Sequence, residues 1–192
     1  QTLFNMYGDG LQARLDLDQG NNQAAFDQAS QLAARMRALD FSQDESGGNI
    51  RDASAVRANF LRNTLATLTL AALRTGRYGE AEQRFQEVVS RAGSTLYART
   101  GRLGLAEVQV AQKKYDNAIT IYTEMSRDTS SQMPVDGVLM QLGRALALAG
   151  RKEEAVRAFT RVTEEFPTSL YAADAKRELE EAEVEDDEEE GE

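Results

Sequence analysis

The sequence predicts an all-α fold in which helices pair into consecutive hairpins, and three observations support this class. Apolar residues recur three and four positions apart along most of the chain, which is the spacing of one face of an α-helix. β-Branched residues do not alternate with polar ones, and the chain has only two prolines. A small residue followed four positions later by an aromatic residue returns twice at a step of 37 residues, in the pairs Ala81 and Phe85, Ala118 and Tyr122, and Ala155 and Phe159.

The first predicted hairpin, residues 3–39, is the most divergent. Its turn segment GNNQAA begins at Gly20 and ends on Ala25, which lies 56 residues before Ala81 and so departs from the step of 37. A polar, glycine-bearing stretch between this hairpin and the next accounts for most of the difference. We therefore expect residues 41–49 to form a mobile loop.

Three more regular hairpins follow the first. They are predicted at residues 52–92, 95–127 and 135–166. Their turn segments, GRYGEA, KKYDNA and GRKEEA, each end on the small residue of the repeated pair. In the last hairpin, Gly143 and Ala155 are small at the points where two antiparallel helices come closest. Phe159 is the bulky residue that fills the space between them.

A final helix and an acidic tail complete the predicted organisation. Residues 168–183 carry a narrow apolar stripe and an otherwise polar surface, as the terminal helix of a stack of repeats requires. We expect residues 184–192 to be disordered, because acidic side chains repel one another and are unfavourable at the negative end of a helix dipole. Residues 1–183 are thus predicted to form one domain.

The last hairpin resembles a tetratricopeptide repeat (TPR). The pattern of that family places an apolar residue, Leu-Gly, a large apolar residue, Ala, an aromatic residue and Pro along about 34 residues. In this sequence these positions are held by Leu139, Leu142, Gly143, Leu146, Ala155, Phe159 and Pro167. The resemblance implies a right-handed solenoid of about four TPR-like hairpins plus a C-terminal capping helix.

The junction after the last hairpin resembles a P-x-S-x-Y-A-x-x-A motif of bacterial cell-envelope TPR proteins, among them the assembly-machine lipoprotein and the Tol-Pal coordinator. The residues that carry it are Pro167, Ser169, Tyr171, Ala172 and Ala175. The layout is also similar to the periplasmic part of the ancillary Sec-translocon subunit family, which carries an N-terminal membrane anchor. These resemblances imply the periplasm or cell envelope, with the cytoplasm as the alternative. They leave open whether a signal or anchor was removed before Gln1.

Composition excludes several classes of function. The chain has no cysteine and no histidine, so it lacks thiolates and the commonest general base and metal ligand. We therefore predict no catalytic residue, no cofactor and no metal site. Eight charges of the net −10 lie in residues 183–192, and this acidic end disfavours nucleic acid as a partner. No apolar run reaches about 18 residues, so we predict no membrane span within this chain.

On this basis we predict a non-catalytic scaffold for protein–protein interaction, which binds a protein or peptide along the stacked first helices. The residues expected to line that groove are Asn63, Leu70, Thr100, Leu103, Glu107, Met140 and Arg144, with Arg14 as a further candidate. Chaperone-binding TPR proteins hold a terminal carboxylate with a Lys/Asn/Arg cluster. Here Gly10, Thr67 and Gly104 stand at corresponding positions, so that role is not expected.

Two alternatives remain beside the scaffold. A structural subunit that self-associates into a homo-oligomer would expose an apolar patch on a terminal hairpin. An enzyme with a carboxylate-only site, for instance Glu107 with Arg144, would need a strongly perturbed pKa inside a closed pocket. These two charges could equally pair with each other on the surface. The acidic tail could attract a basic partner or simply keep the chain soluble.

Overall fold

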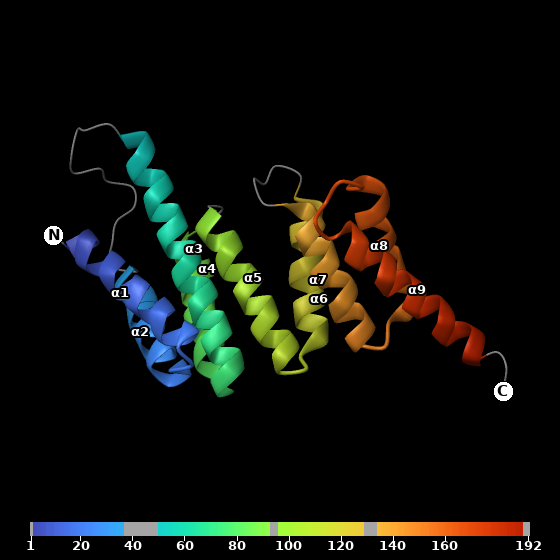
Figure 1. The fold of residues 1–192 in the computed structure, drawn as a ribbon, viewed down its shortest axis with the longest axis horizontal. Coiled ribbons are helices and arrows are strands. Elements are labelled where there is room, and N and C mark those ends of the chain that lie inside the picture. Colours follow the sequence, from blue (N-terminus) through green and yellow to red (C-terminus); the bar gives the residue numbers. More distant parts are fainter. Residues whose placement is uncertain (1, 37–49, 93–95, 129–133, 190–192) are drawn as a thin grey trace. The chain divides into compact units, whose positions relative to one another are not determined.

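The computed structural model describes residues 2–36, 50–92, 96–128 and 134–189, and these residues contain α-helices and no strand (Figure 1). The helices are α1 (Thr2–Asp18), α2 (Asn22–Met36), α3 (Ile50–Thr75), α4 (Tyr78–Ala92), α5 (Leu96–Ala111), α6 (Tyr115–Arg127), α7 (Val135–Leu148), α8 (Lys152–Glu165) and α9 (Ala172–Glu189). The predicted all-α class is confirmed. The loop predicted at residues 41–49 lies outside the described residues.

The chain divides into two compact units. Unit 1, Gln1–Gln112, contains α1 to α5, and unit 2, Lys113–Glu192, contains α6 to α9. In unit 1, α2 packs against α1 and α3, while α5 packs against α3 and α4. In unit 2, α7 packs against α6 and α8, and α8 also packs against α9. Within each unit, helices that are neighbours in sequence are therefore also neighbours in space.

The residues that repeat at a step of 37 form the core of the helix pairs. The small residues are buried as predicted, with exposed fractions of 0% for Ala81, 0% for Ala118 and 3% for Ala155. The aromatic residues are also buried, with 0% for Phe85, 1% for Tyr122 and 2% for Phe159. The step therefore marks a buried position that returns in α4, α6 and α8.

Glycines allow neighbouring helices to approach these aromatic rings closely. A Cβ atom on Gly143 of α7 would overlap the ring of Phe159 on α8, which confirms the predicted close contact between these two helices. In unit 1, a Cβ atom on Gly104 of α5 would lie 2.6 Å from Cε1 of Phe85 on α4. A larger residue at either position would displace the ring, because protein interiors are close-packed.

The turns between paired helices share one backbone conformation. Gly20, Gly76 and Gly150 have φ values of 83°, 70° and 75°, in the left-handed region that glycine adopts without steric cost. After α7, Arg151 N–H bonds the carbonyl of Leu146 and Gly150 N–H bonds that of Ala147, which is the Schellman pattern for ending a helix. The glycine thus ends one helix and reverses the chain for the next.

Two helix boundaries differ from the predicted ones. The long helix α3 begins at Ile50 rather than at residue 52. The last helix begins at Ala172 instead of residue 168, and it continues to Glu189, so the backbone is helical in most of the segment for which we predicted disorder. The reason for the late start is local, because Phe166 and Ser169 accept backbone hydrogen bonds in a turn that precedes α9.

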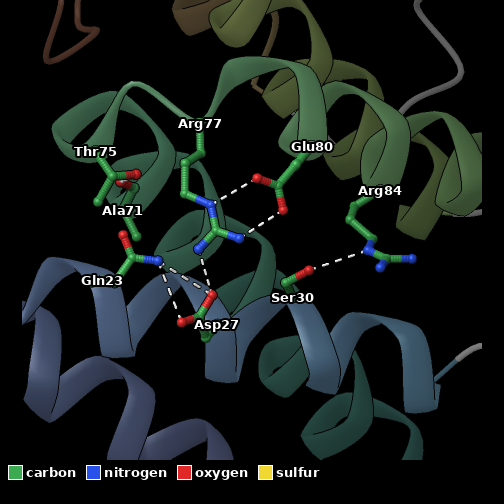
Figure 2. A network of polar contacts seen from close by, with 8 residues as sticks. All are labelled: Gln23, Asp27, Ser30, Ala71, Thr75, Arg77, Glu80 and Arg84. Carbon is green, nitrogen blue, oxygen red and sulfur yellow. Dashed lines mark hydrogen bonds and ion pairs between the residues drawn. The ribbon is translucent and has the colours of Figure 1, made fainter.

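Arg77 joins α4 to α2 at the surface of unit 1 (Figure 2). Its guanidinium donates hydrogen bonds to Asp27 of α2 and, at 2.9 and 2.6 Å, to Glu80 in the first turn of α4. The same group lies over the ring of Phe26, 4.0 Å from its centroid. The hydrogen bonds from Arg77 hold the pKa of Asp27 and that of Glu80 below their usual values.

A similar arginine stands at the corresponding turn of unit 2. Arg151 directly follows Gly150, just as Arg77 follows Gly76. It donates to Glu154 at 2.6 and 2.8 Å and lies 3.8 Å from Asp116 of α6. In both units, an arginine next to the turn glycine thus links the second helix of a hairpin to a helix that precedes that hairpin.

Candidate functional site

The predicted groove residues of α3 lie on a solvent-exposed stripe of that helix. Asn63 and Leu70 are exposed, and so are Ala66 and Leu73, which were not among the predicted groove residues. These four residues are three or four positions apart, so they share one face. Helical periodicity alone could have identified the two that were missed.

The predicted groove residues of α5 form a matching stripe. Thr100, Leu103 and Glu107 are half-buried, and Val110 continues the stripe at the same level of burial. The residues on the opposite side of α5, such as Ala98 and Leu105, are buried. The partly exposed side of α5 is therefore the side that carries the predicted residues.

The stripes of α3 and α5 belong to neighbouring helices of unit 1. The two helices pack against each other (Figure 1). A Cβ atom on Gly104 of α5 would lie 3.0 Å from Oγ1 of Thr69 on α3. We refer to the combined surface as the α3/α5 face. It consists of Asn63, Ala66, Leu70, Leu73, Thr100, Leu103, Glu107 and Val110.

Glu107 is the charged residue of the α3/α5 face. Burial raises the pKa of its carboxyl group above the usual value, because desolvation disfavours the charged form. Among the residues of unit 1 that the structure describes, no cation or hydrogen-bond donor engages this carboxylate. Glu107 is thus a partly desolvated carboxylate whose charge is not compensated by any described residue of its own unit.

The prediction was wrong for Met140. Its side chain on α7 is 0% exposed, so it belongs to the core and cannot contact a partner. Its position in the repeat had predicted that Met140 lines the groove. Neighbouring helices pack around this part of α7 and bury the side chain. A substitution of Met140 would therefore disturb the core and would not test a binding surface.

Arg144 is partly exposed, but it is already engaged within unit 2. Its guanidinium lies 3.1 Å from Glu178 and 3.9 Å from Asp174, both on α9. Nearby, the ring of Tyr171 would lie 3.1 Å from a Cβ atom on Gly137 of α7. The beginning of α9 and the residue before it thus cover the side of α7 on which we expected part of the groove.

The residues of the P-x-S-x-Y-A-x-x-A motif attach α9 in this position. Ser169 donates a hydrogen bond of 2.5 Å to Asp136 in the first turn of α7, and its hydroxyl oxygen accepts one of 3.0 Å from the Tyr171 amide. Ala172 and Ala175 are buried, with exposed fractions of 9% and 0%. The motif therefore orients the last helix across the final hairpin.

The remaining candidate, Arg14, is exposed on α1, where it pairs with Asp18 at 3.2 Å. It does not belong to the α3/α5 face. The structure thus brings Asn63, Leu70, Thr100, Leu103 and Glu107 together on two adjacent helices of unit 1. Met140 and Arg144 lie in unit 2.

Other kinds of site were also considered. In the described ranges, no group of acidic side chains is arranged to hold a metal ion. Nor does any helix in those ranges combine the length and the apolar character needed to cross a membrane. The α3/α5 face is therefore the surface that we develop below.

Helical hairpins that repeat a small-residue and aromatic contact, with an exposed stripe on their first helices, define the class of helical-repeat proteins. The chain belongs to the family of the tetratricopeptide repeat-like domain, whose sequence model matches residues 16–168. No curated protein matches the sequence significantly. The TPR resemblance of the last hairpin is thereby confirmed.

Membership in this family indicates a general type of function. TPR-like domains typically bind protein partners and serve as scaffolds for protein–protein interaction, and the family is generally non-catalytic. Neither the family nor the fold specifies the partner of this chain.

Proposed function

We propose that this protein is a non-catalytic scaffold that binds a segment of a partner protein on the α3/α5 face. The observation that carries the proposal is the pair of exposed leucines on α3. Leu70 is 38% exposed and Leu73 is 37% exposed, and they stand one helical turn apart on the same side. Exposed apolar side chains that adjoin one another are typical of a surface that a partner covers.

The helices that carry this face, α3 and α5, are packed tightly on their inner sides. Leu68 and Ala72 of α3 are 0% exposed, as is Ala106 of α5. Phe85 of α4 contacts α5 closely at Gly104. Side chains on such rigid helices lose little conformational freedom when a partner binds, which favours affinity.

The proposed setting is a bacterial cell-envelope complex, either an assembly machine or a complex associated with the translocon. Support for it comes from the junction motif, which in this chain makes the Ser169 hydrogen bond to Asp136. A fusion of the full-length protein to alkaline phosphatase, which is active only outside the cytoplasm, tests this setting. Activity of the fusion is the expected result, and an inactive but stable fusion would argue for the cytoplasm.

Photocrosslinking in cells tests the scaffold function. A photoreactive amino acid at Leu73 is expected to give a discrete crosslinked partner, because this side chain is exposed on the α3/α5 face. The same amino acid at Leu148 serves as a matched control, since Leu148 is an exposed leucine of unit 2, at 58%. Crosslinks at Leu148 and none at Leu73 would contradict the proposed site.

The double variant Leu70→Ser and Leu73→Ser complements this experiment. It should abolish capture of the crosslinked partner while leaving the circular dichroism spectrum unchanged, because both side chains are partly exposed. A variant that still captures the partner with full yield would move the binding surface elsewhere.

A self-associating structural subunit is a second candidate, and it has its own observation. Leu11 and Leu15 on α1 are 58% and 47% exposed. The turn glycines Gly20 and Gly76 align these leucines with Thr67 and Ala71 of α3, which are almost completely buried. The exposed side of α1 therefore corresponds to a side of α3 that other helices cover.

Sedimentation velocity separates this candidate from the first. If the open side of α1 joins two copies, the protein sediments as a dimer, and the double variant Leu11→Ser and Leu15→Ser sediments as a monomer. A wild-type protein that remains monomeric at high concentration would exclude self-association through this surface.

A further inference from the structure

The chain contains its own example of how such a face is covered. In unit 2, α9 packs against α8, and side chains at its start reach α7: Tyr171 lies against Gly137, and the carboxylates of Asp174 and Glu178 lie near Arg144. An aromatic side chain and opposite charges on one helical segment thus bind one side of a first helix. The contact is amphipathic, because it combines an aromatic ring with ion pairs between two carboxylates and a single arginine.

The same register exists on α5 with the opposite charge. The step of 37 residues takes Gly137 to Thr100 and Arg144 to Glu107. Where α7 carries a cation that binds the carboxylates of α9, α5 carries a carboxylate. A partner segment that contacts α5 at Glu107 would therefore be basic at this point.

Nearby arginines of unit 1 do not supply the missing charge. Arg74 at the end of α3 donates to the carbonyl of Leu17 at 3.0 Å and to Asn22 at 3.3 Å. Arg62 and Arg102 are engaged in interactions of their own. The carboxylate of Glu107 has no such partner among the described residues of its unit, and burial makes its charge costly until a cation approaches.

We propose that the α3/α5 face binds an amphipathic segment of a partner protein in which a lysine or arginine pairs with Glu107 and adjoining apolar side chains cover Leu70 and Leu73. This inference rests on the proposed scaffold function and adds the chemistry of its partner. Glu107 is half-buried, so solvent screens its charge less than it screens the charges of an exposed salt bridge. The ion pair with the partner should therefore contribute more to binding than an exposed salt bridge does. An acidic segment is disfavoured on the same ground.

Selection from a phage library of random 12-residue peptides on the full-length protein tests the inference. Clones that also bind the Leu70→Ser and Leu73→Ser variant are removed, so that the remaining clones depend on the α3/α5 face. We expect these clones to be enriched in a lysine or arginine next to leucine, isoleucine, phenylalanine or methionine. Their affinity should fall about tenfold or more for Glu107→Lys, because like charges then meet at a desolvated position.

Control variants separate the effect of the charge at Glu107 from that of the shape of its side chain and from that of the net charge of the protein. Glu107→Gln keeps the shape of the side chain and should weaken the selected peptides less than Glu107→Lys does. Glu153→Lys makes the same change of charge on an exposed residue of α8, whose side chain is 92% exposed, and should leave affinity unchanged. Thermal melting of each variant establishes first that the fold is retained.

A reciprocal selection on the Glu107→Lys variant completes the experiment. It should yield peptides with aspartate or glutamate in place of the basic residue. Face-dependent peptides without a basic residue, or an unchanged preference after Glu107→Lys, would overturn the inference while leaving the scaffold function intact. Failure to obtain any face-dependent peptide would count against the scaffold function itself.

Discussion

At the scale of single residues, Lys113 differs from its counterparts in the other turns. It has a φ of 60°, while the residues at the corresponding turn positions are Gly20, Gly76 and Gly150. Gly76, Lys113 and Gly150 are separated by the same step of 37 residues. A side chain in the left-handed region has a steric cost that glycine avoids.

We predict that Lys113→Gly stabilises the protein by about 1 kcal/mol, because it removes this cost. The gain is partly offset by the larger conformational entropy of glycine in the unfolded chain. Urea unfolding measures the effect. The reverse change at the equivalent position, Gly150→Ala, should destabilise the protein, and a neutral result for both variants would contradict the account.

Gln109 of α5 is a second residue that departs from the repeat. The step of 37 residues relates it to Ala72 and Leu146, both apolar core residues. Gln109 is only 6% exposed, and among the described residues its Oε1 atom has no hydrogen-bond partner. A buried polar atom without a partner lowers stability.

Gln109→Leu is accordingly expected to raise the free energy of unfolding by about 1 kcal/mol. Chemical denaturation at neutral pH measures the change. Gln112→Leu is the matched control, because Gln112 donates to Glu82 at 2.9 Å and its replacement removes a hydrogen bond. An equal gain in both variants would indicate that general hydrophobicity, rather than the unpaired oxygen, is responsible.

At the scale of helices, the small residues set how closely neighbours pack. Ala118 of α6 is 0% exposed. Ala118→Leu should overpack its contact and destabilise the protein by about 1–3 kcal/mol, since a close-packed core has no room for three more carbon atoms. The melting temperature measures this loss. Ala147→Leu on the exposed side of α7 is the control, and an unchanged melting temperature for Ala118→Leu would refute the packing role.

The contact between α2 and α4 should depend on pH through Asp27. The hydrogen bond from Arg77 lowers the pKa of Asp27 in the folded state, so the folded protein binds this proton more weakly than the unfolded chain does. The stabilising contribution is therefore present above the ordinary pKa of about 4 and is lost as the pH falls through the lower folded-state value. Because Asp27 is 46% exposed, solvent screening limits the contribution to less than about 1 kcal/mol.

Comparison of the wild-type protein with Asp27→Asn checks this linkage. The wild-type protein is expected to be the more stable of the two at pH 6, and the difference should shrink below about pH 4. Chemical denaturation across this range measures both proteins. A difference that stays constant from pH 6 to pH 3 would show that charge on Asp27 does not stabilise the contact.

At the scale of the whole molecule, charge is distributed very unevenly. Residues 183–192 hold eight of the net −10 charges, so the rest of the chain is nearly neutral. The backbone of α9 is helical as far as Glu189, although like charges repel along that stretch. Such a helix end gains little stability from its own side chains.

Deletion of residues 184–192 is therefore expected to leave the melting temperature and its cooperativity unchanged. The helical circular dichroism signal should fall only in proportion to the residues removed. A marked loss of cooperativity in the truncated protein would show that the acidic segment supports the fold.

The sequence by itself determined the features that depend on neighbours along the chain. Helical periodicity and the turn glycines act within one hairpin, and the step of 37 residues repeats the same local pattern from one hairpin to the next. The all-α class and the burial of Ala81, Ala118 and Ala155 could therefore be predicted. The same reasoning placed Leu70, Leu103 and Glu107 on the partly exposed sides of their helices. Local periodicity states which residues share a face.

Only the tertiary structure decided which faces remain open and which charges find partners. Met140 shares the periodicity of a groove residue but is buried by neighbouring helices, and Arg144 is paired by α9 although Glu178 lies 34 residues away in sequence. Leu11 and Leu15 are exposed because no helix of the described chain covers that side of α1. The physical reason is that contacts between segments distant in sequence determine burial and desolvation. The local periodicity of a sequence does not predict which of those contacts form.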